Sequence, residues 1–146
     1  MTSTPSGCLD CTRRQFLALG SLAAVSSFLA ACGSDSSEPT GLGQVNVTVR
    51  PGDYLALAVV GGIARVQGIS APVALVRATE SSYRAFSMIC PHQGTVIAIS
   101  GSGFRCPNHG ATFNGTGAWT GGERTSRLFE LTVSSNASAG TITIST

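Results

Sequence analysis

The chain has 146 residues, with nine basic side chains, all of them arginine, seven acidic side chains and a formal net charge of +2 at pH 7. This length allows one domain of ordinary size with a hydrophobic core. The charges are nearly balanced, and the sequence contains no basic run and no basic patch interleaved with aromatic residues. The composition therefore argues against a nucleic-acid-binding protein, and we expect no nucleic-acid partner.

The first 31 residues are arranged like an export signal. The pair Arg13-Arg14 is followed by Phe16 and by a weakly apolar stretch over 17–31, which is shorter than the roughly 20 residues needed to span a bilayer. This layout resembles a bacterial twin-arginine signal peptide, so we expect a helical signal segment over 1–31. The stretch ends in Leu29-Ala30-Ala31-Cys32, which resembles a lipobox and implies cleavage before Cys32 and lipid attachment to it. An uncleaved membrane anchor is the alternative.

A flexible tether is expected over 32–43, where Ser, Gly, Asp and Pro dominate and almost nothing is apolar. The folded domain is expected over 44–146. Upstream of the arginine pair, Cys8 and Cys11 form a C-x-x-C motif, which in other settings indicates redox or metal chemistry. Because these two cysteines lie in the expected signal peptide, we assign them no role.

From residue 44 onward the sequence indicates β-structure throughout. Short apolar or alternating runs are separated by Gly, Ser, Asn and Pro, and no window has a sustained helical period. Many short strands at close spacing predict an all-β fold, a small antiparallel sandwich or barrel. The predicted strands cover 45–50, 54–60, 63–67, 73–78, 83–89, 95–100, 103–105, 128–133 and 141–145.

Two similar segments, Cys90-Pro91-His92 and Cys106-Pro107-Asn108-His109, contain both histidines of the chain and both cysteines of the expected domain. Thiolate and imidazole side chains bind iron and zinc in proteins. Proline stiffens each loop, and Gly94 and Gly110 leave room for the backbone to approach a cofactor. A hairpin turn over 100–103 would bring the two loops side by side. The pattern therefore predicts a metal site whose ligands are Cys90, His92, Cys106 and His109.

The residues alone leave three kinds of site open. A binuclear cluster is favoured, because each loop offers one Cys and one His. A structural zinc site in a surface lipoprotein would use the same ligands, although zinc fingers usually keep Cys with Cys and His with His. A disulfide between Cys90 and Cys106 suits an exported protein, but it leaves both histidines unexplained.

The paired motif, C-x-H and C-x-x-H on two loops of an all-β domain, resembles the Rieske iron–sulfur proteins. The run His109-Gly110-Ala111-Thr112-Phe113 is similar to the family pattern of Gly, a small residue and then an aromatic residue. The resemblance covers about 45–144. It implies one 2Fe-2S cluster, in which Cys90 and Cys106 hold one iron while His92 and His109 hold the other. It also implies electron transfer that can be coupled to proton transfer at the imidazoles.

By this resemblance the chain is an electron carrier, or the small subunit of a membrane or periplasmic oxidoreductase, rather than a stand-alone enzyme. Similar Rieske subunits occur in cytochrome bc complexes and in molybdenum-containing arsenite oxidases. The expected redox partner is therefore a quinol-oxidising complex, a cytochrome or a molybdenum enzyme. The expected location is a membrane facing the periplasm or the cell exterior, reached through the lipid on Cys32. Twin-arginine export carries folded proteins, which suits a cofactor inserted in the cytoplasm.

Two differences from the Rieske subunits of bc complexes bear on the site. Those subunits brace their loops with a disulfide, whereas this chain has Gln93-Gly94-Thr95 and Asn108 at the corresponding places. They also tend to have Ser and Tyr where this chain has Ala111 and Phe113, and hydroxyls that donate to sulfur stabilise the reduced cluster. We therefore predict a midpoint potential below the quinol-oxidising type, within the Rieske range of about −150 to +300 mV.

The remaining aromatic and glycine residues near the motif have simpler expected roles. Phe113 and Trp119 are expected to pack in the core or against a loop. The pair Gly121-Gly122 closes a glycine-rich segment and is expected near the cluster, where the family has a third loop.

Overall fold

The computed structural model describes residues 42–146. The expected signal peptide and lipid-attachment site, including Arg13, Arg14 and Cys32, lie outside these residues, as do Cys8, Cys11 and most of the expected tether. No helix within the described part is long and apolar enough to cross a membrane. Leu42, the first described residue, is already buried in the core.

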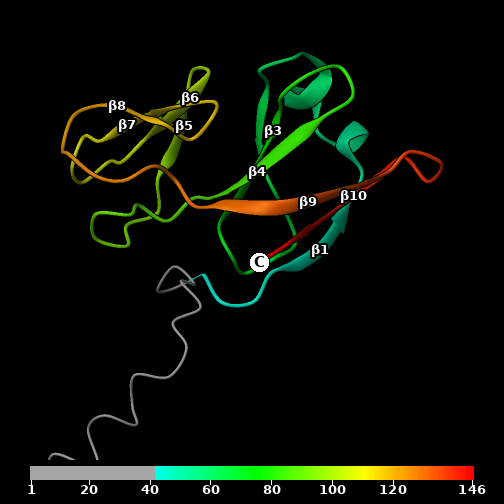
Figure 1. Cartoon of the computed structure of the whole chain (residues 1–146), viewed down its shortest axis with the longest axis horizontal. Helices are drawn as coiled ribbons and strands as arrows, with labels where there is room; N and C mark the ends of the chain where they lie inside the picture. Colours follow the sequence, from blue (N-terminus) through cyan, green and yellow to red (C-terminus); the bar gives the residue numbers. More distant parts are fainter. Residues whose placement is uncertain (1–41) are drawn as a thin grey trace, which may run out of the picture. The chain divides into compact units, whose positions relative to one another are not determined.

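Six strands form the larger sheet, in the order β1-β10-β9-β4-β3-β2 (Figure 1). All five neighbouring pairs are antiparallel. The strands are β1 (Asn46–Val49), β2 (Ile63–Arg65), β3 (Val73–Arg77), β4 (Tyr83–Ser87), β9 (Glu130–Asn136) and β10 (Thr141–Ser145). Strand β3 has four buried residues in a row, as expected for a strand covered on both faces. Strand β10 instead alternates, with Ile142 and Ile144 buried.

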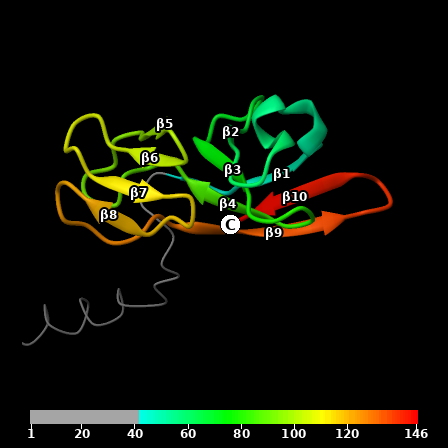
Figure 2. The same cartoon turned by 90° about the horizontal axis from the view of Figure 1, so that it is seen from above.

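Four shorter strands form a second antiparallel sheet in the order β5-β6-β7-β8. They are β5 (Ala98–Ser100), β6 (Gly103–Arg105), β7 (Thr112–Asn114) and β8 (Trp119–Gly121). All four come between β4 and β9 in the sequence, although β4 and β9 are paired in the larger sheet. Figures 1 and 2 show the smaller sheet at one end of the fold, away from the β9–β10 hairpin. The smaller sheet is thus an insertion between β4 and β9, two paired strands of the larger sheet.

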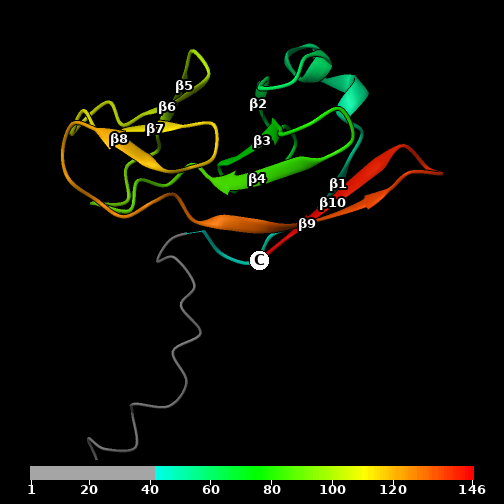
Figure 3. The same cartoon turned by 45° about the horizontal axis from the view of Figure 1, so that its top comes forward.

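The predicted antiparallel all-β fold is confirmed, but the strand predicted over 54–60 is wrong. Two short 3₁₀ helices, η2 (Pro51–Asp53) and η3 (Leu55–Ala58), occupy this region and lie beside β2 and β3 (Figure 3). Arg77 explains the difference, because its Nη1 donates to the carbonyl oxygens of Leu57 at 3.1 Å and Ala58 at 2.7 Å. A strand would have needed those oxygens for a neighbouring strand. Strands β7 and β8 were not predicted.

The buried residues fall into two clusters. One joins η3 to the larger sheet and includes Leu57, Leu75, Leu131 and Ile144. The other joins β3 and β4 to the smaller sheet, and its members are Ile63, Ala74, Val76, Phe86, Met88, Cys90, Ile97, Phe104, Cys106, Ala111, Phe113 and Leu128. Both cysteines of the domain therefore belong to the core that holds the smaller sheet in place.

Candidate metal centre

The first loop leaves β4 and returns to β5, and its backbone closes on Cys90. The Cys90 N–H donates to the Thr95 carbonyl at 2.7 Å, and the Gly94 N–H donates to the Cys90 carbonyl at 2.9 Å. Gly94 has a φ of +69°, which an L side chain rarely adopts. The glycine four residues after the cysteine is thus what lets the chain turn back.

The second loop joins β6 to β7 and repeats this pattern. The Cys106 N–H donates to the Ala111 carbonyl at 2.8 Å, and the Gly110 N–H donates to the Cys106 carbonyl at 3.0 Å. Gly110 has a φ of +67°. Each cysteine therefore starts a turn of the same geometry, closed at the fourth and fifth residues after it.

The two loops bring all four predicted ligand residues together. Cys90 and Cys106 are 1% and 0% exposed, whereas His92 is exposed and His109 is half-buried. The ligand atoms of Cys90, Cys106 and His109 lie within 4.8 Å of one another, and the Cys106 Sγ is 3.4 Å from the His109 Nδ1. The rings of His92 and His109 meet edge to face, with centroids 4.5 Å apart. The site thus has sulfur on its core side and imidazole on its solvent side.

Two further contacts hold the loops, and the sequence did not reveal the first of them. The Asn108 Nδ2 donates to the Thr95 Oγ1 at 3.1 Å and so joins the second loop to the first. Both cysteines of the described chain are free thiols. The bonded residues, Thr95 and Asn108, belong to the places that the sequence comparison matched with the disulfide brace of the bc-complex subunits, so a side-chain hydrogen bond links the loops there. Gly122 packs against the Gly110 carbonyl, which places the glycine-rich segment beside the second loop, as predicted.

The neighbouring aromatic residues lie close to their predicted places. Phe113 is buried in the core that contains both cysteines. Trp119 pairs with Phe113 across β7 and β8, is 37% exposed, and donates from its indole nitrogen to the Glu123 carbonyl at 3.0 Å. Phe113 is therefore a core residue, and the indole hydrogen bond of Trp119 stabilises the loop that follows β8.

Burial and a nearby thiol govern the acidity of the Cys90 thiol. Burial raises the pKa of the Cys90 thiol, a backbone hydrogen bond at His92 opposes this, and the neighbouring Cys106 raises it further. A thiol held protonated in this way must release its proton when a metal binds, because thiolate is the ligand form.

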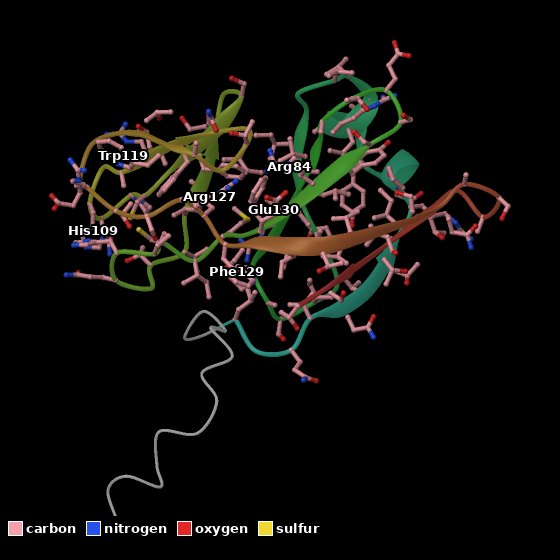
Figure 4. The ribbon with its side chains drawn as sticks, in the orientation of Figure 1. Arg84, His109, Trp119, Arg127, Phe129 and Glu130 are labelled. Carbon is pink, nitrogen blue, oxygen red and sulfur yellow. The ribbon has the colours of Figure 1, made fainter. Side chains whose placement is uncertain are left out.

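An ionic cluster lies where the segment after β8 enters β9 (Figure 4). Arg84 donates to both carboxylate oxygens of Glu130 at 2.6 Å, and Arg127 lies 3.5 Å from the same carboxylate. Arg127 also donates to the Thr116 carbonyl at 3.2 Å, in the turn between β7 and β8. This cluster therefore links the larger sheet to the smaller one.

A protein-family model for the Rieske [2Fe-2S] domain matches residues 48–132, which is more than half of the chain. This chain belongs to the Rieske [2Fe-2S] domain family. A search among curated proteins gave no match. The match contains both cluster loops and most strands of this Rieske domain.

Solved structures of the quaternary ammonium Rieske monooxygenase CntA share the fold. Its apo form matches with a TM-score of 0.54 and 23% identity, over 70% of this chain and 33% of that one. A second structure, whose description concerns carnitine oxidation by gut microbiota and inter-subunit electron transfer, matches with a TM-score of 0.52 and 23% identity, over 69% and 30%. This Rieske chain thus spans about a third of the length of these neighbours.

As a Rieske domain, the chain binds one [2Fe-2S] cluster. The donors present fit that group, because the loops offer two sulfur and two nitrogen donors, the sulfurs are buried, and the donor atoms of three of the four candidate residues lie within 4.8 Å of one another. The family assignment decides among the alternatives that the sequence left open, in favour of the iron–sulfur cluster over structural zinc or a disulfide.

Proposed function

We propose that this chain is an exported, lipid-anchored electron-transfer protein whose cluster is ligated by Cys90, His92, Cys106 and His109. The observation that carries the ligand assignment is the repeated loop geometry. Each loop closes on its cysteine with the same two backbone hydrogen bonds, and each extends one histidine toward solvent. A [2Fe-2S] cluster with this ligand set accepts and donates one electron at a time.

The buried and exposed halves of the site have different tasks in this proposal. Cys90 and Cys106 fix the position of the cluster, because they are immobilised in the core. His92 and His109 form the surface that a redox partner meets. The Nδ1 of His109 faces the Cys106 sulfur, so its Nε2 is on the other side of the ring.

A groove of about 740 Å³ beside His92 supports a partner surface at this end of the molecule. It is lined by the first loop and by the segment that leads into β9, including Arg127, Leu128 and Phe129. Phe129 is 36% exposed, and Figure 4 shows it below the Arg127 and Glu130 side chains. A partner that approaches His92 therefore finds both an apolar wall and a cation next to it.

The partner we infer is a component of a membrane or periplasmic oxidoreductase, of the bc or arsenite-oxidase type. The twin-arginine pair and Cys32 support this placement, because they describe an exported protein held at a membrane. A structural neighbour is described with inter-subunit electron transfer, which supports electron exchange between such a domain and another subunit.

The ligand assignment is tested on the full chain by EPR after dithionite reduction, with iron and acid-labile sulfide assayed on the same sample. We expect a Rieske signal in the parent chain and its loss in His92→Ala, whose exposed side chain is dispensable for packing. Gln93→Ala, at the exposed position next to His92 in the same loop, is the matched control, and it should keep the full signal. An unchanged spectrum in His92→Ala would contradict the assignment.

Export and partner class need separate measurements. Incorporation of labelled palmitate should be lost in Cys32→Ala, and export should be blocked when Arg13 and Arg14 are both changed to Lys.

A stopped-flow assay with the oxidised chain then distinguishes the partners. Reduction by a quinol supports a bc-type role, whereas reduction only by a reduced molybdenum enzyme supports an arsenite-oxidase-like role.

A further inference from the structure

An exposed apolar segment, residues 55–60, lies far from the metal centre. Leu55 is 91% exposed, Val59 66% and Val60 54%, and they are the three most exposed large hydrophobic side chains of the described chain. No charged residue occurs between Asp53 and Arg65. A cluster of exposed apolar side chains marks an interaction surface. We call residues 55–60 the apolar tip.

Several backbone groups of the apolar tip, most of them carbonyls, are hydrogen-bonded within the protein. The Arg77 guanidinium binds the Leu57 and Ala58 carbonyls, the Gly62 N–H donates to the Val59 carbonyl at 3.0 Å, and the Leu57 N–H donates to the Tyr54 carbonyl at 2.9 Å. A backbone that enters an apolar medium needs its polar groups satisfied in this way. Each carbonyl bonded in this way lowers the cost of moving the tip out of water.

The surroundings of the apolar tip resemble the boundary between lipid and water. Both tyrosines of the chain, Tyr54 and Tyr83, line a cavity of about 200 Å³ together with Leu55. Tyrosine is enriched at membrane interfaces, where its ring lies at the level of the headgroups. The cation of Arg77 is bound only to carbonyl oxygens and forms no ion pair with a carboxylate among residues 42–146. An anionic headgroup would compensate that charge.

We propose that the apolar tip inserts into the interface of an anionic lipid bilayer. The bonded carbonyls of Leu57, Ala58 and Val59, the two nearby tyrosines and a cation without a carboxylate partner favour a bilayer over a groove in a partner protein. Figures 1 and 2 show the helical turns of this region beside the larger sheet and apart from the β5–β8 sheet. The inserted tip leaves the metal centre open to a partner in the aqueous phase. This contact is independent of any lipid on Cys32, and together the two would fix the orientation of the domain.

The test measures where one tryptophan lies when the full chain is bound to vesicles. In a Trp119→Phe background the native tryptophan is gone, so Leu55→Trp reports on the tip and Ser134→Trp, on the exposed side of β9, is the control. Vesicles of phosphatidylethanolamine and phosphatidylglycerol are prepared with and without brominated acyl chains. We expect the brominated chains to lower Leu55→Trp emission about twofold or more, and to leave Ser134→Trp unchanged.

Three outcomes would overturn the proposal. They are the absence of quenching in vesicle-bound Leu55→Trp, equal quenching at both positions, and shielding of Leu55→Trp that appears only when a partner protein is added. The last outcome would assign the tip to a protein interface. The EPR spectrum of Leu55→Trp should match that of the parent chain, so this test is separate from the test of the ligands. A chain with Leu55, Val59 and Val60 all changed to Ser should also lose the vesicle binding that the tip adds.

Discussion

Gly122 lies directly against the carbonyl oxygen of Gly110, so that a Cβ on Gly122 would come within 2.0 Å of that oxygen. The carbonyl belongs to the loop of His109, and it cannot move aside like the end of a flexible side chain. Gly122 also has a φ of +73°. Two independent constraints therefore require glycine where the chain returns from β8 past the second loop.

Gly122→Ala is expected to distort the second loop and to lower the amount of bound cluster. The backbone strain alone costs about 1–2 kcal/mol, and the contact with Gly110 adds to it. Gly140→Ala is the matched control, because Gly140 has a φ of +62° but nothing within 4 Å of a built Cβ. Iron and acid-labile sulfide per chain should fall in Gly122→Ala and stay constant in Gly140→Ala. Equal cluster content in both variants would contradict the steric argument.

The hydrogen bond between Asn108 and Thr95 is expected to slow the separation of the two loops. Asn108→Ala and Thr95→Val should each speed the loss of visible absorbance in the presence of a chelator, and the double variant should behave like either single variant. The expected coupling is about 0.5–1.5 kcal/mol, toward the lower end because both groups are near solvent.

The control for this pair is the hydroxyl contact between Thr48 and Thr143, at 2.9 Å on the β1–β10 pair. Thr48→Val should change the urea midpoint slightly without changing the rate of cluster loss. If it speeds cluster loss as much as Asn108→Ala does, the loop bridge has no special role.

The ion pair of Glu130 with Arg84 should make stability depend on pH in the acid range. The hydrogen bond from Arg84 lowers the pKa of the Glu130 carboxyl, with a smaller contribution from the charge of Arg127. Its stabilising contribution is therefore complete above the unfolded pKa of about 4.3 and is lost as the pH falls through the lower folded pKa. Because the Glu130 side chain is 37% exposed, we expect only about 0.5–1 kcal/mol.

Urea unfolding at pH 7 and at pH 3 measures this contribution. Glu130→Gln should lower the midpoint at pH 7 and approach the parent chain at pH 3. Glu123→Gln is the control, because Glu123 forms no ion pair in the described part of the chain. A constant difference between Glu130→Gln and the parent at both pH values would show that packing, not charge, is responsible.

Hydroxyls added beside the cluster should raise its midpoint potential. Ala111→Ser and Phe113→Tyr each introduce a donor at a buried position next to the second loop. A hydrogen bond to sulfur worth about 1 kcal/mol corresponds to about 40 mV in a one-electron couple. Protein-film voltammetry should show this rise, while Ala98→Ser on β5 should leave the potential unchanged. A parent midpoint near the top of the Rieske range would contradict the low potential predicted from Ala111 and Phe113.

The four candidate ligand residues, which the structure brings together, could be picked out in the sequence because the pattern that marks them is local. Cysteine and histidine are rare in this chain, and each pair is set by a spacing of two or three residues within one loop. The bridge from Asn108 to Thr95 could not be predicted in the same way. It depends on how the two loops face each other, which is decided by the packing of the smaller sheet.

The errors in the fold have similar causes. Residues 54–60 have the apolar character of a strand. Their carbonyls at Leu57 and Ala58 accept hydrogen bonds from Arg77, which is about 20 residues away in the sequence, so the local pattern could not reveal this contact. Strands β7 and β8 have three residues each, too few for a visible alternation. The sequence does contain a signal for their hairpin, the turn dipeptide Asn114-Gly115. In the structure the Asn114 side chain accepts hydrogen bonds from the Thr116 and Ala118 N–H groups of this turn.

The shortness of β5, β6, β7 and β8 has a consequence for the life of the protein before it receives its cofactor. A sheet made only of three-residue strands has little cohesion of its own, and its core includes the two cysteines that a cluster would join. Without metal, this insertion should open first while the larger sheet stays folded. A newly made chain that missed its cofactor would then expose a protease-sensitive half, and the cell could recognise and destroy it before it is used.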